Sequence, residues 1–353
     1  MLNTAGGSPI NIIEGQYFRD LMAQPEALNA TLAWLDDGKK WAAVKAFVTA
    51  RPWRRILLTG MGSSFHTLHP LNLSLIEAGF APVMMETSEL AHYGLALCDA
   101  ETLIILVSQS GRSAETLRLL ESNQHATVLG ITNTPDSPLA LKPDLALVIQ
   151  AGPEFSVSCK TYVAGMLALQ WLGAIFANKS ERETLDRLLP AGGMVERYLH
   201  DWRRHICVLC EVLRGCRHLF LTGRGRSLAA VGAGALIIKE SSHVHAEGMS
   251  SAAFRHGPLE MLQHDMNSIV FAGEGPTRAL NQGLVRELID EECNCEEIGP
   301  DARLESLRIA DCDSILLPIL EMLPVEMMTL ALAGLALREA GKFERASKVT
   351  TTE

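Results

Sequence analysis

The sequence predicts an α/β protein made of two similar doubly wound domains (flavodoxin-like, αβα) with parallel sheets, preceded by N-terminal helices. Residues 103–107 form an unbroken apolar run, Leu-Ile-Ile-Leu-Val, which is typical of a parallel strand covered on both faces. Such runs alternate with helical stretches, as in doubly wound folds. The strand-and-turn pattern of residues 57–64 returns at residues 219–227, roughly 163 positions later, each time with Thr-Gly-x-Gly. A repeat of that period indicates two domains of one design.

The expected elements follow in order along the chain. Residues 11–50 read as helices without a strand. Strands are expected at 56–59, 82–86, 103–107, 127–132 and 145–150, then at 218–222, 268–272 and 295–298, followed by a long helix at 324–339. The expected domain limits are 1–52 for an N-terminal helical segment, 53–190 and 191–340 for the two domains, and 341–353 for a C-terminal tail.

Composition and charge exclude several classes of function. The 353 residues include 31 Lys plus Arg against 41 Asp plus Glu, a net charge of −10, which argues against a nucleic-acid partner. The longest apolar run, residues 162–177, contains Gln170 and is shorter than the roughly 20 residues that a membrane span needs, so we expect a buried helix there. Residues 1–15 lack the pattern of a signal peptide, and the eight cysteines are irregularly spaced. We therefore expect a cytoplasmic protein with reduced thiols and no membrane association.

The segment Ser108-Gln109-Ser110-Gly111-Arg112-Ser113 stands between the strand at 103–107 and the start of an amphipathic helix. A helix N-terminus offers unpaired N–H groups and a partial positive charge, to which the three serine hydroxyls add donors. The alternative is that these hydroxyls only cap the helix. Capping needs one hydroxyl, whereas the segment carries three serines and a glutamine, so the sequence favours phosphate binding by Ser108, Gln109, Ser110 and Ser113.

Neither a cofactor nor a metal is expected. Gly60-Met61-Gly62 lacks the third glycine of a dinucleotide-binding loop. Cys207 and Cys210 have CxxC spacing but fall within a helical pattern, and zinc sites usually combine two well-spaced pairs in loops. The alternation of His243, His245 and Glu247 fits a half-buried extended segment as well as a set of ligands.

A carboxylate and a histidine stand in positions suited to proton transfer. Lys239-Glu240 closes the helix that follows the second Thr-Gly-x-Gly turn, and His256 belongs to a His-Gly-Pro turn. Together Glu240 and His256 would serve as a base and a proton shuttle. The alternative is a solvated charge pair at Lys239–Glu240 and a purely structural turn at His256.

From about residue 15 to its end, the chain resembles the sugar isomerase (SIS) domain family in its tandem form. That family includes the isomerase half of glucosamine-6-phosphate synthase and the stand-alone glucosamine-6-phosphate deaminases and phosphosugar deglycases. The resemblance is carried by residues 60–64 and 108–113, by 239–247 and 255–258, and by the C-terminal Ser347-Lys348-Val349-Thr350, with Ala23-Gln24-Pro25 matching the leading helices.

The resemblance implies roles for particular residues. Ser108, Gln109, Ser110 and Ser113 would hold the 6-phosphate of a sugar. The implied sugar-binding residues are Gly62, Ser63 and Ser64 in one loop, and Val157, Ser158 and Cys159 in another. Glu240 would move a proton between C1 and C2, His256 would open the sugar ring from the partner subunit of a homodimer, and Lys348 would contact the C2 region from a tail that closes the site.

Three departures from the family pattern concern the substrate. Ala253 stands where the family often has Glu, Thr161 occupies the usual lysine position with Lys160 one place earlier, and residues 341–345 replace a Pro-rich segment. Because the sequence also shows no glutamine-hydrolysing domain, we expect breakdown of an amino-hexose 6-phosphate to ketose 6-phosphate and ammonia by an isomerase/deaminase. The alternatives are a deglycase of fructosyl- or glucosyl-amino-acid 6-phosphates, or a non-catalytic regulator that binds a phosphosugar.

Overall fold

The computed structural model describes residues 12–263, 266–345 and 347–352. The chain divides into two compact units that interleave along the sequence. The first-sheet unit comprises Glu26–Pro153, Lys160–Pro190 and Ala346–Glu353, and the second-sheet unit comprises Met1–Pro25, Glu154–Cys159 and Ala191–Arg345. Each unit contains one parallel sheet with helices on its faces, which confirms the predicted fold class.

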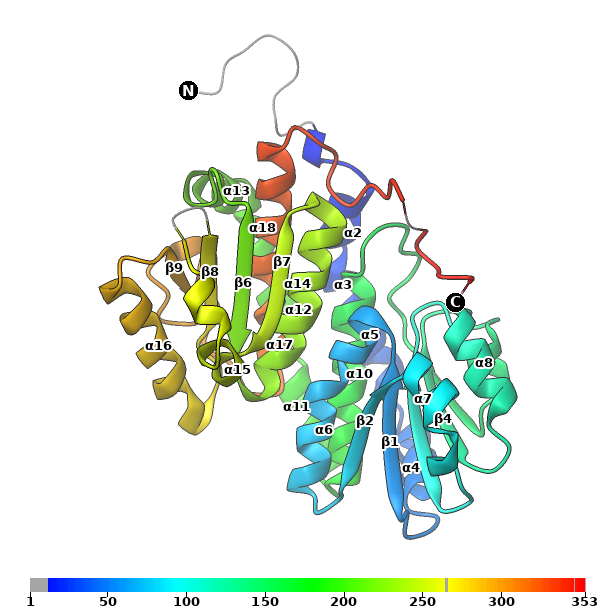
Figure 1. The fold of residues 1–353 in the computed structure, drawn as a ribbon. Coiled ribbons are helices and arrows are strands. Elements are labelled where there is room, and N and C mark those ends of the chain that lie inside the picture. The colour runs from blue at the N-terminus through cyan, green and yellow to red at the C-terminus, as the bar shows by residue number, and fades with distance from the viewer. Residues whose placement is uncertain (1–11, 264–265, 346, 353) are drawn as a thin grey trace. The chain divides into compact units, whose positions relative to one another are not determined.

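The first sheet has five parallel strands in the order β2-β1-β3-β4-β5 (Figure 1). They are β1 (Arg55–Gly60), β2 (Pro82–Glu86), β3 (Thr102–Val107), β4 (Thr127–Thr132) and β5 (Leu145–Val148). All five were predicted from the sequence. Gly60 at the end of β1 pairs with Val107 at the end of β3, so the loops that follow these two strands leave the sheet side by side.

Helices cover both faces of the first sheet because its strands are apolar on both sides. On one face Leu57 and Ile104 pack in a buried cluster with residues of α7 (Thr87–Tyr93), α8 (Ala114–Ser122) and α9 (Pro138–Leu141). Leu58 and Ile105, which point the opposite way, are equally buried. The other helices of this unit are α4 (Gly38–Val48), α5 (Gly62–His66), α6 (Leu68–Glu77), α10 (Lys160–Phe176) and α11 (Glu181–Leu188), with η1 (Leu95–Leu97) and most of α3 (Gln24–Leu35). Helix α10, buried almost throughout, confirms the interpretation of the apolar run at 162–177.

The second sheet repeats the first with one strand fewer. Its order is β7-β6-β8-β9, all parallel, with β6 (His218–Gly223), β7 (His245–Ser250), β8 (Met266–Phe271) and β9 (Cys295–Ile298). Strands β6, β7, β8 and β9 therefore correspond to β1, β2, β3 and β4. His245 and Glu247 lie in strand β7. This confirms the interpretation of their alternation as an extended segment.

Two groups of helices enclose the second sheet. Helix α14 (Leu228–Ser242) contacts β6 and β7 and packs on α18 (Met322–Leu335), which also contacts α13 (Trp202–Val212). On the other face, Phe220 and Val270 cluster with residues of α15 (Ser251–Arg255) and α16 (Arg278–Asp290). The remaining elements are α2 (Gln16–Met22), α12 (Ala191–His200), α17 (Leu317–Leu320), η2 (Gly225–Ser227), η3 (Pro258–Met261), η4 (Gly275–Thr277) and η5 (Glu305–Leu307).

The helix expected at 324–339 begins two residues earlier and ends at Leu335, and Leu337 then takes a left-handed φ of 53°. Together α17 and α18 form a stretch, Leu317–Leu335, that is long and apolar enough to cross a membrane by length and composition. Every residue of its most apolar window is buried inside the fold, as expected of a core helix.

Candidate functional site

The first-sheet unit has a topological switch point between β1 and β3. From β1 the chain passes to β2 on one side of the sheet, whereas β3 lies on the other side. Open α/β sheets bind ligands outside the carboxyl ends of their strands at such points. The sequence singled out two segments that both leave the sheet here. Residues 60–64 run from the end of β1 into α5, and residues 108–113 form the loop after β3.

The predicted phosphate loop, residues 108–113, leaves two of its three serine hydroxyls with a proton to donate. Ser113 is the N-cap of α8, where its Oγ accepts a hydrogen bond from the Thr116 amide (3.4 Å) and donates to Thr116 Oγ1 (2.9 Å). Ser108 Oγ accepts from the Gly111 amide, and Ser110 Oγ accepts from the Arg112 amide, each at 3.2 Å. A hydroxyl that accepts a hydrogen bond still has its own proton to donate. The capping alternative therefore describes Ser113, while Ser108 and Ser110 can donate to an anion.

Glycine is required within this loop at Gly111. Its φ is +60°, and an added Cβ would collide with the side chain of Ser137. The Gln109 carbonyl accepts hydrogen bonds from Thr132 Oγ1 (3.1 Å), at the end of β4, and from Thr134 Oγ1 (3.3 Å), two residues further on. The loop is thus fixed from the neighbouring strand before any ligand binds.

The first turn of α5, which follows β1 closely, contributes an unsatisfied hydroxyl. Ser63 Oγ is buried and has no hydrogen-bond partner among the described residues. It follows Gly62, whose φ is +53°, and the carbonyl of Ser64 is occupied by Thr67 Oγ1 at 2.7 Å. A buried polar group without a partner costs stability, about 1–3 kcal/mol, and often marks a ligand site. Ser63 is therefore the clearest candidate to bind a sugar hydroxyl.

The C-terminal tail reaches the start of α8 within the same unit. The amide of Ala114, the first residue of α8, donates to the carbonyl of Thr350 at 3.0 Å. Lys348, two residues earlier in the tail, is half-buried. Lys348 is therefore two residues away from the tail residue that is hydrogen-bonded to the start of α8.

In the second-sheet unit, Glu240 lies near the end of α14, and its charge acts on a buried tyrosine, Tyr17. Lys239 is exposed, whereas Glu240 is half-buried. Burial above all raises the pKa of the Tyr17 phenol well above 10, and nearby Glu326, Cys159 and Glu240 raise it further by charge repulsion. Glu240 and the loop that contains Cys159 are therefore both close to Tyr17.

The loop of residues 154–159, which contains the expected sugar-binding residues Val157, Ser158 and Cys159, is fixed in place by hydrogen bonds. Glu154 Oε1 accepts from the Cys159 amide at 3.0 Å, and Ser156 Oγ donates to the Gly341 carbonyl at 2.6 Å. The Gly341 amide in turn donates to the Ser241 carbonyl, next to Glu240, at 3.1 Å. Val157 and Cys159 are buried and Ser158 is half-buried. The second-sheet unit thus brings this loop and the Glu240 end of α14 to one place.

His256 is exposed at the end of α15. Its amide donates to the Ala253 carbonyl at 3.0 Å, and Gly257 follows with a φ of 140° that favours glycine. Arg255, beside it, forms an ion pair with Glu287. The imidazole is therefore on the surface, carried by a turn of defined backbone geometry.

Sequence reasoning missed a buried polar cluster beside Glu240. Gln24 Nε2 donates to Glu326 Oε2 at 2.8 Å, and Thr329 Oγ1 donates to the Tyr17 hydroxyl at 3.2 Å. Burial raises the pKa of the Glu326 carboxyl well above 4.5. One signal could have revealed it, because Glu326 is the only charged residue in the apolar run of α18. Nothing in the sequence singles out Tyr17.

The described residues contain no group of three or more His, Cys, Asp or Glu side chains placed to hold a metal ion. In α13, Cys207 is exposed and Cys210 is half-buried, with its Sγ 3.6 Å from the Ala331 carbonyl.

The fold and these loops define a class of protein. The SIS domain model matches residues 51–174 and 212–289, one stretch in each half of the chain, and the chain belongs to the SIS domain family.

Particular relatives agree with this assignment. The chain is similar to the glutamine–fructose-6-phosphate aminotransferase (isomerizing) of Thermococcus kodakarensis, at 30% identity over 85% of this chain and 52% of that protein. Its fold is similar to the C-terminal domain of the glucosamine-fructose-6-phosphate aminotransferase of Francisella tularensis, with a TM-score of 0.81 at 18% identity over 94% of this chain and 99% of that one.

The fold is also similar to the glucosamine-6-phosphate deaminase of Thermotoga maritima, with a TM-score of 0.69 at 18% identity over 90% of this chain and 94% of that one. The chain spans about half the length of the curated relatives that it matches.

Proposed function

We propose that this protein is a phosphosugar isomerase/deaminase that converts an amino-hexose 6-phosphate, such as glucosamine 6-phosphate, to a ketose 6-phosphate and ammonia. The observation that carries the proposal is the hydroxyl-rich edge between β1 and β3, where Ser108 and Ser110 keep donors and Ser63 Oγ has no partner among the described residues. Membership of the SIS family supports the proposal that this edge binds a sugar phosphate.

The phosphate would bind at the N-terminal end of α8. The loop hydroxyls and the helix dipole both favour an anion there. Because the phosphate is remote from C1 and C2, its binding energy serves to hold the reacting carbons in place. Ser63, in the first turn of α5, would donate to a sugar hydroxyl.

Glu240 would carry the proton between the two carbons. In the ring-opened amino sugar it takes the proton from C2, and the electron pair forms a C1=C2 enolamine as the C1 oxygen gains a proton. Glu240 then returns its proton to C1, which leaves an imine at C2. Water adds to that imine, and ammonia leaves as the ketone forms. A positioned carboxylate is a common general base for such transfers.

His256 and Lys348 complete the proposed machinery. The exposed imidazole of His256 is suited to reach a site on a second copy of the chain, where it would move the proton needed for ring opening. Lys348 would contact the C2 region from the tail. A homodimer in which His256 completes the neighbouring site follows from this assignment, and we place the protein in the cytoplasm.

A deglycase is the second candidate, favoured by one observation. Ala253, which stands where the family often has Glu, is an exposed methyl three residues before His256. A short side chain there leaves room for the larger leaving group of a fructosyl- or glucosyl-amino-acid 6-phosphate. A regulator that binds the sugar phosphate without turnover is the remaining alternative.

The test is ammonia release from glucosamine 6-phosphate, coupled to detection of fructose 6-phosphate. Formation of both products supports the deaminase. If neither forms while the conjugates are split, the protein is a deglycase. Binding of hexose 6-phosphates without turnover of either substrate class would leave only the regulator.

A further inference from the structure

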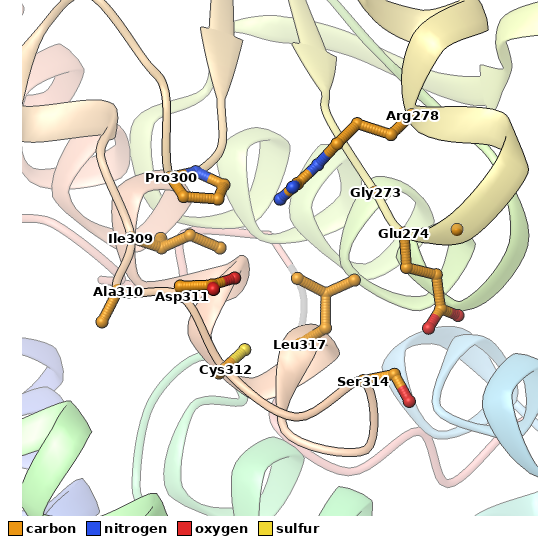
Figure 2. Close-up of a pocket in the computed structure, with 11 residues that line it drawn as sticks. Gly273, Glu274, Arg278, Pro300, Ile309, Ala310, Asp311, Cys312, Ser314 and Leu317 are labelled. Carbon is orange, nitrogen blue, oxygen red and sulfur yellow. The ribbon is translucent and has the colours of Figure 1, made fainter.

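A pocket of about 200 Å³ lies at the carboxyl end of the second sheet (Figure 2). Its walls come from the loop after β8, the start of α16, the second residue after β9 and the segment that leads into α17. They include Glu274, Arg278, Pro300, Ile309, Asp311 and Leu317. Because β8 corresponds to β3, the loop after β8 stands where the first sheet has its phosphate loop. The second sheet therefore has a pocket at the edge that corresponds to the phosphate loop of the first sheet, but different side chains line it.

The chemistry of the phosphate loop is not repeated here. Residues 272–277 carry Glu274 in place of a set of hydroxyls. Its Oε1 accepts from Arg226 Nη1 at 2.7 Å, an ion pair in which both side chains are mostly covered. Figure 2 shows the Glu274 carboxylate turned away from the guanidinium of Arg278. A dianion would meet this carboxylate together with Asp311, so the pocket does not suit a phosphate.

Arg278 brings a positive charge that acts on Glu321 and Glu297 through space but forms no ion pair among the described residues. It is the first residue of α16, and Figure 2 shows its guanidinium directed into the pocket between Pro300 and Leu317. Its buried Nε has no hydrogen-bond partner, and it forms no ion pair within the described part of the chain. Glu321, the buried acid nearby, is bonded instead to Ser227 Oγ at 2.8 Å. A planar guanidinium in this state suits a carboxylate, which it can bind through two parallel hydrogen bonds.

Asp311 brings the opposite charge from the facing wall. Its carboxylate is directed toward the same space in Figure 2, from the segment that also provides Ile309 and Cys312. Asp311 is exposed, and among the described residues it forms neither a hydrogen bond nor an ion pair; Arg278 and Asp311 are therefore not bonded to each other across the pocket. Ile309 and Leu317 add apolar surface between the two charges.

We propose that this pocket binds a small α-amino acid, with the carboxylate on Arg278, the ammonium on Asp311 and the side chain against Ile309 and Leu317. A zwitterion places an opposite charge next to both Arg278 and Asp311, whereas an anion or a cation alone pairs with only one of them. The site is distinct from the proposed sugar-phosphate edge in the first-sheet unit, and it would operate whatever reaction that edge supports.

The test is a calorimetric titration of the full chain with each of the common amino acids. Propionate, ethylamine and inorganic phosphate serve as probes that carry one charge type. At least one amino acid should bind with one site per chain and more tightly than all three of these probes. Arg278→Gln and Asp311→Asn should each weaken that binding by about tenfold or more, the loss expected for a charge-assisted hydrogen bond. Arg278→Lys keeps the positive charge but cannot form two parallel hydrogen bonds, so its affinity should lie between those of the unchanged protein and Arg278→Gln.

Two control variants separate the pocket from other effects. Arg286→Gln changes an exposed arginine on the same helix outside the pocket and should leave binding unchanged. Ser110→Ala, in the phosphate loop, should also leave it unchanged, so that failure of the proposed sugar chemistry and failure of this proposal remain distinguishable. The proposal is wrong if no amino acid binds, if propionate or phosphate binds as tightly as the best amino acid, or if folded Arg278→Gln binds like the unchanged protein.

Discussion

The amide of Ala114 donates a hydrogen bond to the carbonyl of Thr350, with 3.0 Å between nitrogen and oxygen. Ala114 opens α8 directly after the phosphate loop, and Thr350 lies in the tail that carries Lys348. One of the N–H groups at this helix end is thus satisfied by the protein's own C-terminal segment. The tail and the phosphate loop are therefore coupled by a bond that a single substitution can remove.

Ala114→Pro should loosen the tail without unfolding α8. Proline is well tolerated at the first helical position, and Ser113 before it already has the extended ψ of 152° that a following proline requires. Loss of a bond worth about 1 kcal/mol should make the tail open about fivefold more often. Trypsin cleavage after Lys348 should speed up by that factor. Ala114→Ser, which keeps the N–H, should cut at the original rate; equal rates for both variants would mean that the bond does not hold the tail.

Ser110→Ala and Ser113→Ala should separate ligand binding from helix capping. Ser113 caps α8, so its loss should lower the free energy of unfolding by about 1 kcal/mol. Ser110 only accepts from an exposed amide, so its loss should change stability by less than about 0.5 kcal/mol. If Ser110 contacts the phosphate, glucosamine 6-phosphate should bind at least about tenfold more weakly to Ser110→Ala in a calorimetric titration. Unchanged binding would remove Ser110 from the phosphate site.

The sequence allowed strand β3 and the helix cap that follows it to be predicted, because both depend on local chemistry. Residues 103–107 are apolar without a break, and Ser113 stands one residue before a helix, so both read directly as a strand and a cap. Tyr17 could not be placed near Glu326 or Glu240, because more than 200 residues of chain separate it from either of them. The ion pair between Arg226 and Glu274 was also hidden, because 48 residues separate the two and local sequence gives no sign that they meet.

Glu321→Gln should flatten part of the dependence of stability on pH. Burial raises the pKa of Glu321 to about 8, although Ser227 opposes this by donating a hydrogen bond to the carboxylate. Between the unfolded pKa of about 4.3 and the folded value, the native state holds a proton that the unfolded chain has released. The stability that Glu321 contributes is therefore complete below the unfolded pKa and is lost as the pH rises toward 8, by up to about 1.4 kcal/mol per pH unit.

The measurement is urea unfolding at several pH values between 5 and 8. As the pH rises over this range, the free energy of unfolding should fall less for Glu321→Gln than for the unchanged protein. Relative to the unchanged protein, the variant should therefore be more stable near pH 8 than it is near pH 5. Glu326, another buried acid whose pKa burial raises, remains in both proteins, so the profile should not become flat. Parallel profiles for the two proteins would show that Glu321 does not titrate as a buried acid.

Mixed dimers should test whether His256 acts across an interface. Inactive Glu240→Gln and His256→Asn chains would be mixed under conditions of subunit exchange. Because each mixed dimer has one site with both groups intact, ammonia release should return to about a quarter of the unmutated level at equal proportions. Exchange followed by mass spectrometry is the control. Complete exchange without recovered activity would place both groups in one chain's site.

Glu240 is proposed to move the proton between C1 and C2 of a phosphosugar, and a comparison of Glu240→Gln with Lys239→Gln tests this role. The neighbouring Lys239 is exposed, so its substitution controls for changes at the end of α14. Ammonia release from glucosamine 6-phosphate and calorimetric binding of the same compound would be measured for both. We expect Glu240→Gln to lose turnover by about a hundredfold or more while binding persists, and Lys239→Gln to retain both. Turnover that survives in Glu240→Gln would contradict the proposed mechanism.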